Sequence, residues 1–368
     1  MRSILYCCFL ALALVAFQGT AYAYHNAGVA DCQGCHTMHN SLNGAPMDTT
    51  NGGHGHEYLL IYGNGSDTCL HCHASYGQFD GGAGYGPGGD FYWLTKTFTW
   101  NYHGQHSSIG DSHGHNVISP ANGLTPDSRL THAPGGDFLA SQEGCTSCHD
   151  PHGNTNFRLL YDNTTPGPIY AGNRYSFQYP APLAKGNART TYVGGGGNET
   201  NSQHTVYKNG VSDWCANCHP NFHSNLTTNF VHPEGAIGSS IAAAYNAYVN
   251  TDNLHGGNSA TSYWGLVPFE AVEVDLTQVN PANYTQGPTG VDQVMCLTCH
   301  RAHASPFQSI GRWEFDQTWV VDSHPQNGDG GASPSDVTNK YYQYTFVTDQ
   351  RSLCNKCHVK DMGDGPHN

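Results

Sequence analysis

The apolar residues of this chain are scattered, and their pattern predicts little regular secondary structure. Residues 237–249 form the best candidate helix, because the segment is rich in alanine and its apolar positions recur at helical spacing. Residues 342–348 predict a strand, which would be short. Clusters of Asn, Gly, Pro and Thr elsewhere favour turns and coil, and residues 81–90 and 194–197 read as glycine-rich loops.

One long apolar run stands at the start of the chain and predicts a secretory signal. Arg2 supplies a positive charge, residues 4–17 are apolar, and Ala21-Tyr22-Ala23 matches a small-residue cleavage site. We therefore expect residues 1–23 to be removed and residues 24–368 to form a single exported domain. No later stretch reaches the roughly 18 apolar residues of a membrane span.

Six copies of Cys-x-x-Cys-His account for every cysteine outside the first eight residues. Each copy is typical of a c-type haem attachment site, in which two thiols on one turn form thioethers and the next residue ligates the iron. Paired cysteines also bind zinc or form disulfides, but neither alternative explains a histidine after all six pairs. The expected attachment residues are Cys32, Cys35, Cys69, Cys72, Cys145, Cys148, Cys215, Cys218, Cys296, Cys299, Cys354 and Cys357, and the expected proximal ligands are His36, His73, His149, His219, His300 and His358.

Composition supports a cofactor-rich protein. Hydrophobic residues make up 38% of the chain and charged residues 11%, against norms of about 45–50% and about 25%. Such a chain buries too little apolar surface on its own, so six covalent haems would form much of its core. The fold class we expect is a multihaem cytochrome, mostly coil with short helices and few short strands wrapped around stacked haems. The net charge of −14 disfavours nucleic-acid binding.

Histidine supplies the most economical second axial ligand, because 18 of the 24 histidines lie outside the motifs and methionine is scarce. Three candidates follow a proximal histidine by three residues and a fourth follows by four. At that offset a side chain cannot reach the far side of its own porphyrin, so each must serve a neighbouring haem and draw two haems together. The candidate distal ligands are His39, His152, His303, His223, His25, His115 and His232.

The remaining histidines are expected at the surface or beside haem propionates. They are His54, His56, His103, His106, His113, His132, His204, His255, His324 and His367, and His71 inside the second motif is expected to be exposed. Which six of the seven distal candidates bind, and to which haem, stays open at this point.

Several segments resemble the OmcS-like family of extracellular hexahaem nanowire cytochromes. The likeness includes all six motifs in order and so covers the chain from residue 24 to its end, although the loops at 154–210 and 304–350 look different and shorter. The segments that carry it are residues 24–41, 114–116, 148–153, 214–219, 296–305 and 353–358.

The resemblance implies a continuous stack of bis-histidine haems and subunits that join head to tail into filaments. It further implies that the histidine three residues after the first motif, His39 here, ligates a haem of the adjacent subunit. The recipient would be the haem on Cys296, Cys299 and His300. A contact of this kind is heterologous and open-ended, which is the geometry that generates fibres.

The function we expect is extracellular electron conduction to other cytochromes, metal oxides or electrodes. A monomeric hexahaem shuttle in the periplasm or at the cell surface is the alternative. A multihaem reductase needs an iron with an open coordination position, often marked by a lysine in place of the motif histidine. All six motifs end in histidine, so we expect no enzyme.

Overall fold

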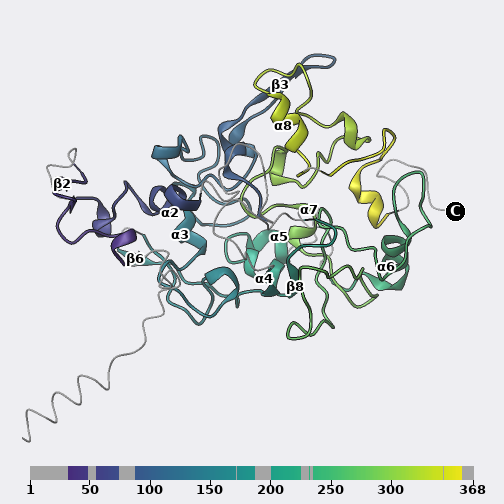
Figure 1. Cartoon of the computed structure of the whole chain (residues 1–368), viewed down its shortest axis with the longest axis horizontal. Helices are drawn as coiled ribbons and strands as arrows, with labels where there is room; N and C mark the ends of the chain where they lie inside the picture. Colours follow the sequence, from purple (N-terminus) through teal and green to yellow (C-terminus); the bar gives the residue numbers. More distant parts are fainter. Residues whose placement is uncertain are drawn as a thin grey trace, which may run out of the picture.

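The computed structural model describes residues 32–48, 55–73, 88–170, 172–186, 200–224, 232, 235–342 and 344–358. Its short elements are spread along the long axis of the molecule (Figure 1). The N-terminal segment with β2 (Ala45–Pro46) lies at one end of the molecule. The helices α3 (Cys145–Cys148), α4 (Val211–Cys215) and α7 (Cys296–Cys299) lie in the middle, and α6 (Gly238–Ala247) lies towards the other end. The order in space is not simply the order in sequence, because α6 precedes α7 in the chain but lies farther towards that end. The turns that carry the motifs are nevertheless spread along the molecule.

Coil and single turns make up most of the described chain, as the sequence predicted. The α-helices are α2 (Gly65–His73), α3 (Cys145–Cys148), α4 (Val211–Cys215), α5 (Pro220–Ser224), α6 (Gly238–Ala247), α7 (Cys296–Cys299) and α8 (Pro334–Asn339). The 3₁₀ turns are η1 (Cys32–Gly34), η2 (Glu57–Leu59), η4 (Phe91–Thr95), η5 (Gly110–Ser112), η6 (Pro120–Asn122), η7 (Ala140–Gln142), η8 (Phe157–Leu159), η9 (Gln308–Ile310), η10 (Val320–Asp322) and η11 (Leu353–Lys356).

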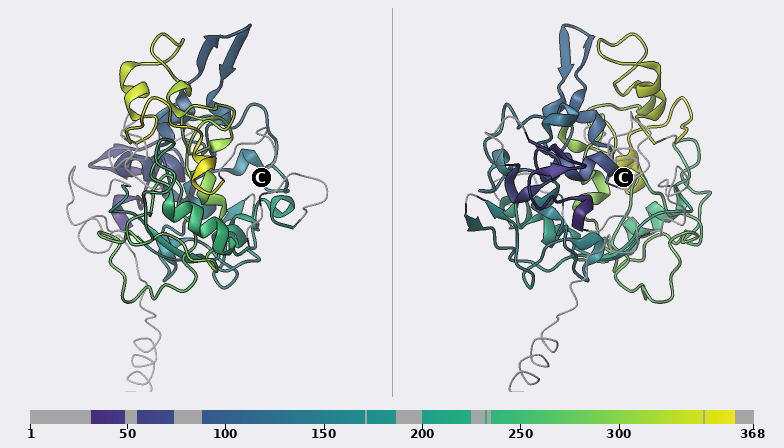
Figure 2. Two further views of the ribbon diagram at one scale, coloured as in Figure 1. Left: turned by 90° about the vertical axis from the view of Figure 1, so that its right-hand side faces the viewer. Right: turned by 60° about the vertical axis from the view of Figure 1, so that its left-hand side comes forward.

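The strands pair only in separate two-stranded antiparallel hairpins within the described residues. They are β1 (Ser41–Leu42) with β2 (Ala45–Pro46), β3 (Phe98–Asn101) with β4 (Gln105–Ser108), β5 (Ile169–Tyr170) with β6 (Asn173–Arg174), and β7 (Leu183–Lys185) with β8 (Val206–Asn209). The β3–β4 hairpin projects from the body (Figure 2). Two-stranded ribbons are marginal alone, so packing elsewhere must stabilise the fold.

The helix expected at 237–249 is confirmed as α6, whose Ala242 and Tyr245 are buried. The strand expected at 342–348 is wrong. Tyr342 has a left-handed φ of 55°, and the described residues of the segment run on as coil. Tyr344 and Phe346 pack against an aromatic cluster instead, and side-chain packing there takes the place of strand pairing.

That aromatic cluster is the largest apolar core among the described residues, and it belongs to the C-terminal third of the chain. It includes Tyr245, Trp264, Phe307, Trp313 and Leu353. Smaller clusters surround Leu70 and Trp93, nearer the N-terminus. The peptide thus has one substantial core of its own.

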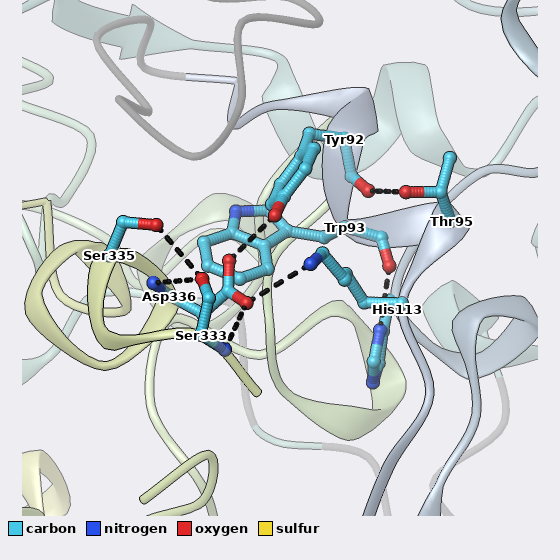
Figure 3. A network of polar contacts seen from close by, with 8 residues as sticks. Tyr92, Trp93, Thr95, His113, Ser333, Ser335 and Asp336 are labelled. Carbon is cyan, nitrogen blue, oxygen red and sulfur yellow. Dashed lines mark hydrogen bonds and ion pairs between the residues drawn. The ribbon is translucent and has the colours of Figure 1, made fainter. Parts of the chain in front are cut away.

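A polar network links the early part of the chain to α8 (Figure 3). The Asp336 carboxylate is fully buried, accepts a 2.8 Å hydrogen bond from the Tyr92 hydroxyl and lies 3.1 Å from the Lys96 ammonium. Ser333 caps the same helix, and the Asp336 carboxylate accepts from the Ser333 amide at 2.8 Å. A buried carboxylate satisfied in this way fixes the position of two segments 244 residues apart.

The described part of the chain contains no helix that is long and apolar enough to cross a membrane.

Candidate haem sites

Each of the six motifs begins in a short helical turn, as the sequence predicted. In five of them the amide of the motif histidine donates to the carbonyl of the first cysteine, four positions back, at 2.9–3.1 Å. This bond closes one helical turn and keeps both cysteines and the histidine on it. The five histidines are His36, His149, His219, His300 and His358, whereas His73 ends the longer α2.

A second turn binds the histidine ring at the first, third and fifth motifs. The ring nitrogen Nδ1 lies 2.9 Å from the Tyr58 carbonyl oxygen at His36, and 2.8 Å from the Arg158 and Ser309 carbonyl oxygens at His149 and His300. Two further rings are held by more distant segments, namely His219 by the Pro134 carbonyl and His115 by the Ala302 carbonyl, both at 2.7 Å.

These contacts decide which ring nitrogen carries the proton. A carbonyl oxygen only accepts, so Nδ1 is the donor in each case and Nε2 keeps its lone pair. A neutral imidazole with a free Nε2 is the form that binds a metal. The backbone therefore holds these rings in the form that is able to bind a metal.

Four motif histidines face a second histidine. The ring centroids are 6.1 Å apart for His36 and His152, 6.3 Å for His149 and His303, 6.1 Å for His115 and His219, and 6.2 Å for His232 and His358. Neither His152 nor His303 faces the histidine of its own motif, in agreement with the spacing argument.

The separations fit a bis-histidine haem iron. An iron held at about 2 Å from each ligating nitrogen places the centroids of two opposed imidazoles about 6 Å apart. The four pairs all match this value, although their interplanar angles range from 17° to 68°. Each pair also has two motif cysteines beside it in sequence, which are the groups that a covalent haem requires.

Burial keeps several of these imidazoles neutral. Desolvation lowers the pKa of His115, His149, His219 and His300, and it lowers the pKa of His303 to about 3, with a further contribution from His149. A protonated histidine cannot ligate iron, so lowered pKa values favour the ligand form at physiological pH.

The motifs are also joined to one another by serine side chains. The Ser66 hydroxyl in α2 accepts from the Cys145 amide at 3.1 Å, and the Ser212 hydroxyl in α4 accepts from the Cys296 amide at 3.0 Å. The second motif is thereby fixed to the third, and the fourth to the fifth. Each serine lies three residues before its motif, followed by aspartate, and this Ser-Asp signal is visible in the sequence.

The surroundings of His300 differ from those of the four motif histidines that face a second histidine. Among the residues that the structure describes, no second histidine ring lies opposite it, and the nearest aromatic contact is the edge of Phe315 at 5.6 Å. His39, the corresponding candidate of the first motif, is exposed. In the described region the His300 ring thus lacks a facing histidine, and the candidate ligand His39 lies at the surface.

Two of the candidate distal ligands have side chains that the structure does not describe. His25 falls outside the described residues, and the backbone of His223 is described as part of α5 but its side chain is not. His73 ends α2, and its distal partner is not among the histidine pairs above.

Two of the histidines expected at the surface or beside haem propionates are not at the surface but are buried and hydrogen-bonded within the protein. The His113 ring donates from Nδ1 to the Trp93 carbonyl at 2.9 Å and accepts from the Ser108 hydroxyl at 2.7 Å. His204 stacks on Tyr263 at 3.5 Å and hydrogen-bonds the Tyr284 carbonyl. The expectation failed because the polarity of histidine does not reveal whether the fold supplies partners in the interior.

The fold and the paired cysteine and histidine side chains define a multihaem c-type cytochrome. The doubled Cys-x-x-Cys-His family model matches residues 139–168, which include the third motif. The chain is 34% identical to C-type cytochrome OmcS of Geobacter sulfurreducens over 429 aligned positions, covering 95% of this chain and 97% of that protein.

Solved structures agree with this match. The chain is similar to the OmcS nanowires of Geobacter sulfurreducens, with a TM-score of 0.76 at 33% identity over 92% of this chain and all of that one. A second structure, the outer membrane cytochrome S filament of the same organism, gives a TM-score of 0.75 at 33% identity over 91% of this chain and 99% of that one. The chain belongs to the family of the c-type cytochrome OmcS.

Proposed function

We propose that this protein is exported and carries electrons over long distances outside the cell as a head-to-tail filament of subunits with six bis-histidine c-type haems. The two related structures are filaments of a cytochrome with the same fold, which supports assembly of this chain with itself. Other redox cytochromes, metal oxides and electrodes are the partners that an exposed chain of haems would serve.

Each haem, when bound, takes up and releases one electron at its iron. The protein's part is to hold two neutral imidazoles opposite each other, which leaves no open coordination position for a substrate. For this reason we assign the chain electron transfer and no enzymatic reaction. The distribution of motifs along the molecule suits transfer from site to site (Figure 1).

The assignment of ligands follows a regular order along the chain. The histidine three residues after the third motif, His152, faces the ring of the first motif, and the corresponding His303 of the fifth motif faces the ring of the third. If this order continues by one step, the next histidine of this type faces His300. That histidine is His39 of a following subunit, since His39 is the remaining member of the set and is exposed.

The second series has the same regularity. His115 precedes the third motif and faces the ring of the fourth, and His232 precedes the fifth motif and faces the ring of the sixth. By the same order His25, which precedes the first motif, would be the second ligand of the haem of the second motif, together with His73. This leaves His223 as the one candidate without an assigned haem.

The observation that carries the proposal is the stepwise pairing of His152 and His303, two of the three histidines in Cys-His-x-x-His. Continued by one step, this order requires a ligand from another subunit opposite His300, and it leaves His39 without a haem in its own subunit. This pairing occurs twice inside the chain, and the contact between two subunits would repeat it. Each added subunit would again offer one exposed His39 and one His300 ring, so the filament can grow without closing.

The test is replacement of His39 by alanine. His39→Ala should leave six haems attached, because thioether formation does not need this residue, and should abolish filaments. Electron microscopy would count filaments and a pyridine haemochrome assay would count haems. His255→Ala removes an exposed histidine that has no assigned haem and should assemble normally.

Normal filaments from His39→Ala would remove the proposed bond between subunits. If the unmodified protein, exported and fully loaded with haem, stays monomeric at high concentration, the diffusible shuttle replaces the filament.

A further inference from the structure

Each of three turns contains two consecutive residues in the left-handed region of φ, a conformation that is strained for residues other than glycine. The pairs are Tyr58-Leu59 (φ 56° and 55°), Arg158-Leu159 (51° and 59°) and Ser309-Ile310 (55° and 54°). They contribute six of the ten non-glycine residues with positive φ in the described part of the chain. We call them the left-handed pairs.

The strain at these positions is considerable. A left-handed conformation costs roughly 1–2 kcal/mol for each residue with a Cβ, and it is rarest for β-branched residues such as Ile310. None of the six positions is Gly or Asn, the residues that adopt this region most easily. Strained backbone that recurs in the same setting calls for a functional explanation.

All three left-handed pairs make the same contacts. The first carbonyl accepts from Nδ1 of a motif histidine, as described above for His36, His149 and His300. The second carbonyl accepts from the amide after that histidine, with Leu59 bonded to Thr37 at 2.7 Å and with Leu159 and Ile310 bonded to Asp150 and Arg301 at 2.8 Å.

The conformation explains how two adjacent carbonyls can serve one histidine. In an extended strand successive carbonyls point to opposite sides, whereas in a helical conformation of either hand they point the same way. A left-handed pair therefore aims one carbonyl at the ring and the next at the backbone beside it. An isolated β-bridge next to each pair completes the attachment, joining His36 to Leu60, His149 to Leu160 and His300 to Gly311.

We propose that the left-handed pairs are positioning elements for the proximal imidazoles of three alternate haems, those of the first, third and fifth motifs. They fix the ring orientation, keep the proton on Nδ1 and, through that hydrogen bond, make Nε2 a more basic ligand. A more basic ligand favours ferric iron, so the left-handed pairs lower the reduction potentials of these three haems. The inference rests on the proposed iron ligation but does not depend on filament assembly.

Arg158 offers a matched pair of variants because its side chain is exposed. Arg158→Gly removes the charge and the strain but keeps the carbonyl in place, whereas Arg158→Pro removes the same charge and fixes φ near −65°. In an optical redox titration, one haem of Arg158→Pro should move to a more positive potential than the same haem in Arg158→Gly. The low-spin electron paramagnetic resonance signal of that haem should shift as well.

Stability supplies an independent readout. Arg158→Gly should raise the midpoint of chemical denaturation, because glycine relieves the left-handed strain. If Arg158→Pro does not fold, Arg158→Val tests the same point more mildly, since a β-branched side chain disfavours the left-handed region. Its potential should shift in the same direction.

Equal potentials for the glycine variant and the folded proline or valine variant would overturn the proposal. The haem count and the presence of filaments, measured on the same samples, report on the proposed function alone. If filaments fail to form but the difference in potential remains, the proposed assembly is wrong and this inference stands. If filaments form but the potentials are equal, this inference is wrong.

Discussion

The turns around His149 and His300 have the same local structure and different surroundings. Both rings donate from Nδ1 at 2.8 Å to a left-handed residue nine positions later. His149 faces His303 inside the chain at 6.3 Å, whereas His300 meets only the edge of Phe315 among the described aromatic rings. The difference therefore lies in what is packed opposite the ring.

The comparison indicates that a surface for assembly can have the same local structure as a contact inside the subunit, with only the facing histidine missing. The His300 turn is already fixed by its own subunit, because the buried Arg312 guanidinium donates to the His300 carbonyl and to the Gly265 carbonyl, both at 3.0 Å. Phe307 and Trp313 anchor the same turn in the aromatic core. In the proposed filament, a neighbouring subunit would have to supply only the missing ligand, and the His300 turn would need little rearrangement.

The largest expected effect comes from removing the histidine that faces His149 inside the chain. His303→Ala should leave one haem with a single axial histidine, so a high-spin signal and carbon monoxide binding should appear for one haem. Because the missing ligand is intramolecular, this high-spin haem should be present in filaments and in dispersed subunits alike, and dispersal should add only the high-spin haem of the fifth motif. Electron paramagnetic resonance before and after dispersal would measure it.

The unmodified protein is the matched comparison for His303→Ala. Its filaments should be low-spin throughout, and dispersal should produce one high-spin haem, that of the fifth motif. A low-spin spectrum in fully dispersed subunits would show that His300 already has an internal partner, and the contrast between the two turns would disappear.

The aromatic core behind His300 should respond to alkaline pH through Lys340. Burial lowers the pKa of this ammonium to about 8, although its Nζ donates to the Ser323 and Pro325 carbonyls. The folded protein releases the proton near pH 8 and the unfolded chain near 10.5, so the unfolded state binds more protons in between. The free energy of unfolding should therefore rise by roughly 3 kcal/mol from this group between those pH values.

Denaturant titrations at several pH values would check this slope. Lys340→Met should lose it, and Lys208→Met, which alters a half-buried lysine, should retain it. Identical slopes in the unmodified protein and in Lys340→Met would mean that Lys340 is solvated and that the core is less complete than described.

The smallest expected effect concerns the exposed part of the junction at His300. Phe315 is 39% exposed and would be covered by an incoming subunit. Phe315→Ala should weaken each contact by about 1 kcal/mol and raise the concentration needed for assembly about five-fold. Sedimentation of filaments would measure this, with Leu254→Ala, 36% exposed, as the control. An equal response from both variants would assign the effect to general stability.

Sequence predicted the covalent chemistry best, because Cys-x-x-Cys-His encodes attachment within five residues. The helix at α6 was also predictable, since its alanine-rich pattern is local. The strand at 342–348 was wrong because alternating aromatics pack equally well from coil against a core. Distal pairing stayed open, since His303 lies 154 positions from His149 in the sequence and only the fold brings them together.

The left-handed pairs gave no sequence signal. Tyr58-Leu59, Arg158-Leu159 and Ser309-Ile310 share neither glycine nor asparagine, the usual indicators of positive φ. Hydrogen bonds to a motif histidine impose the conformation, which is a tertiary effect that local propensity does not contain.

The most direct test of the account is cryo-electron microscopy of the protein recovered from the medium or sheared from cells that produce it. We predict filaments with unbroken haem density across subunit boundaries and with the side chain of His39 bound to the iron beside His300 of the neighbouring subunit. Single particles with six haems and a histidine of the same chain opposite His300 would contradict it.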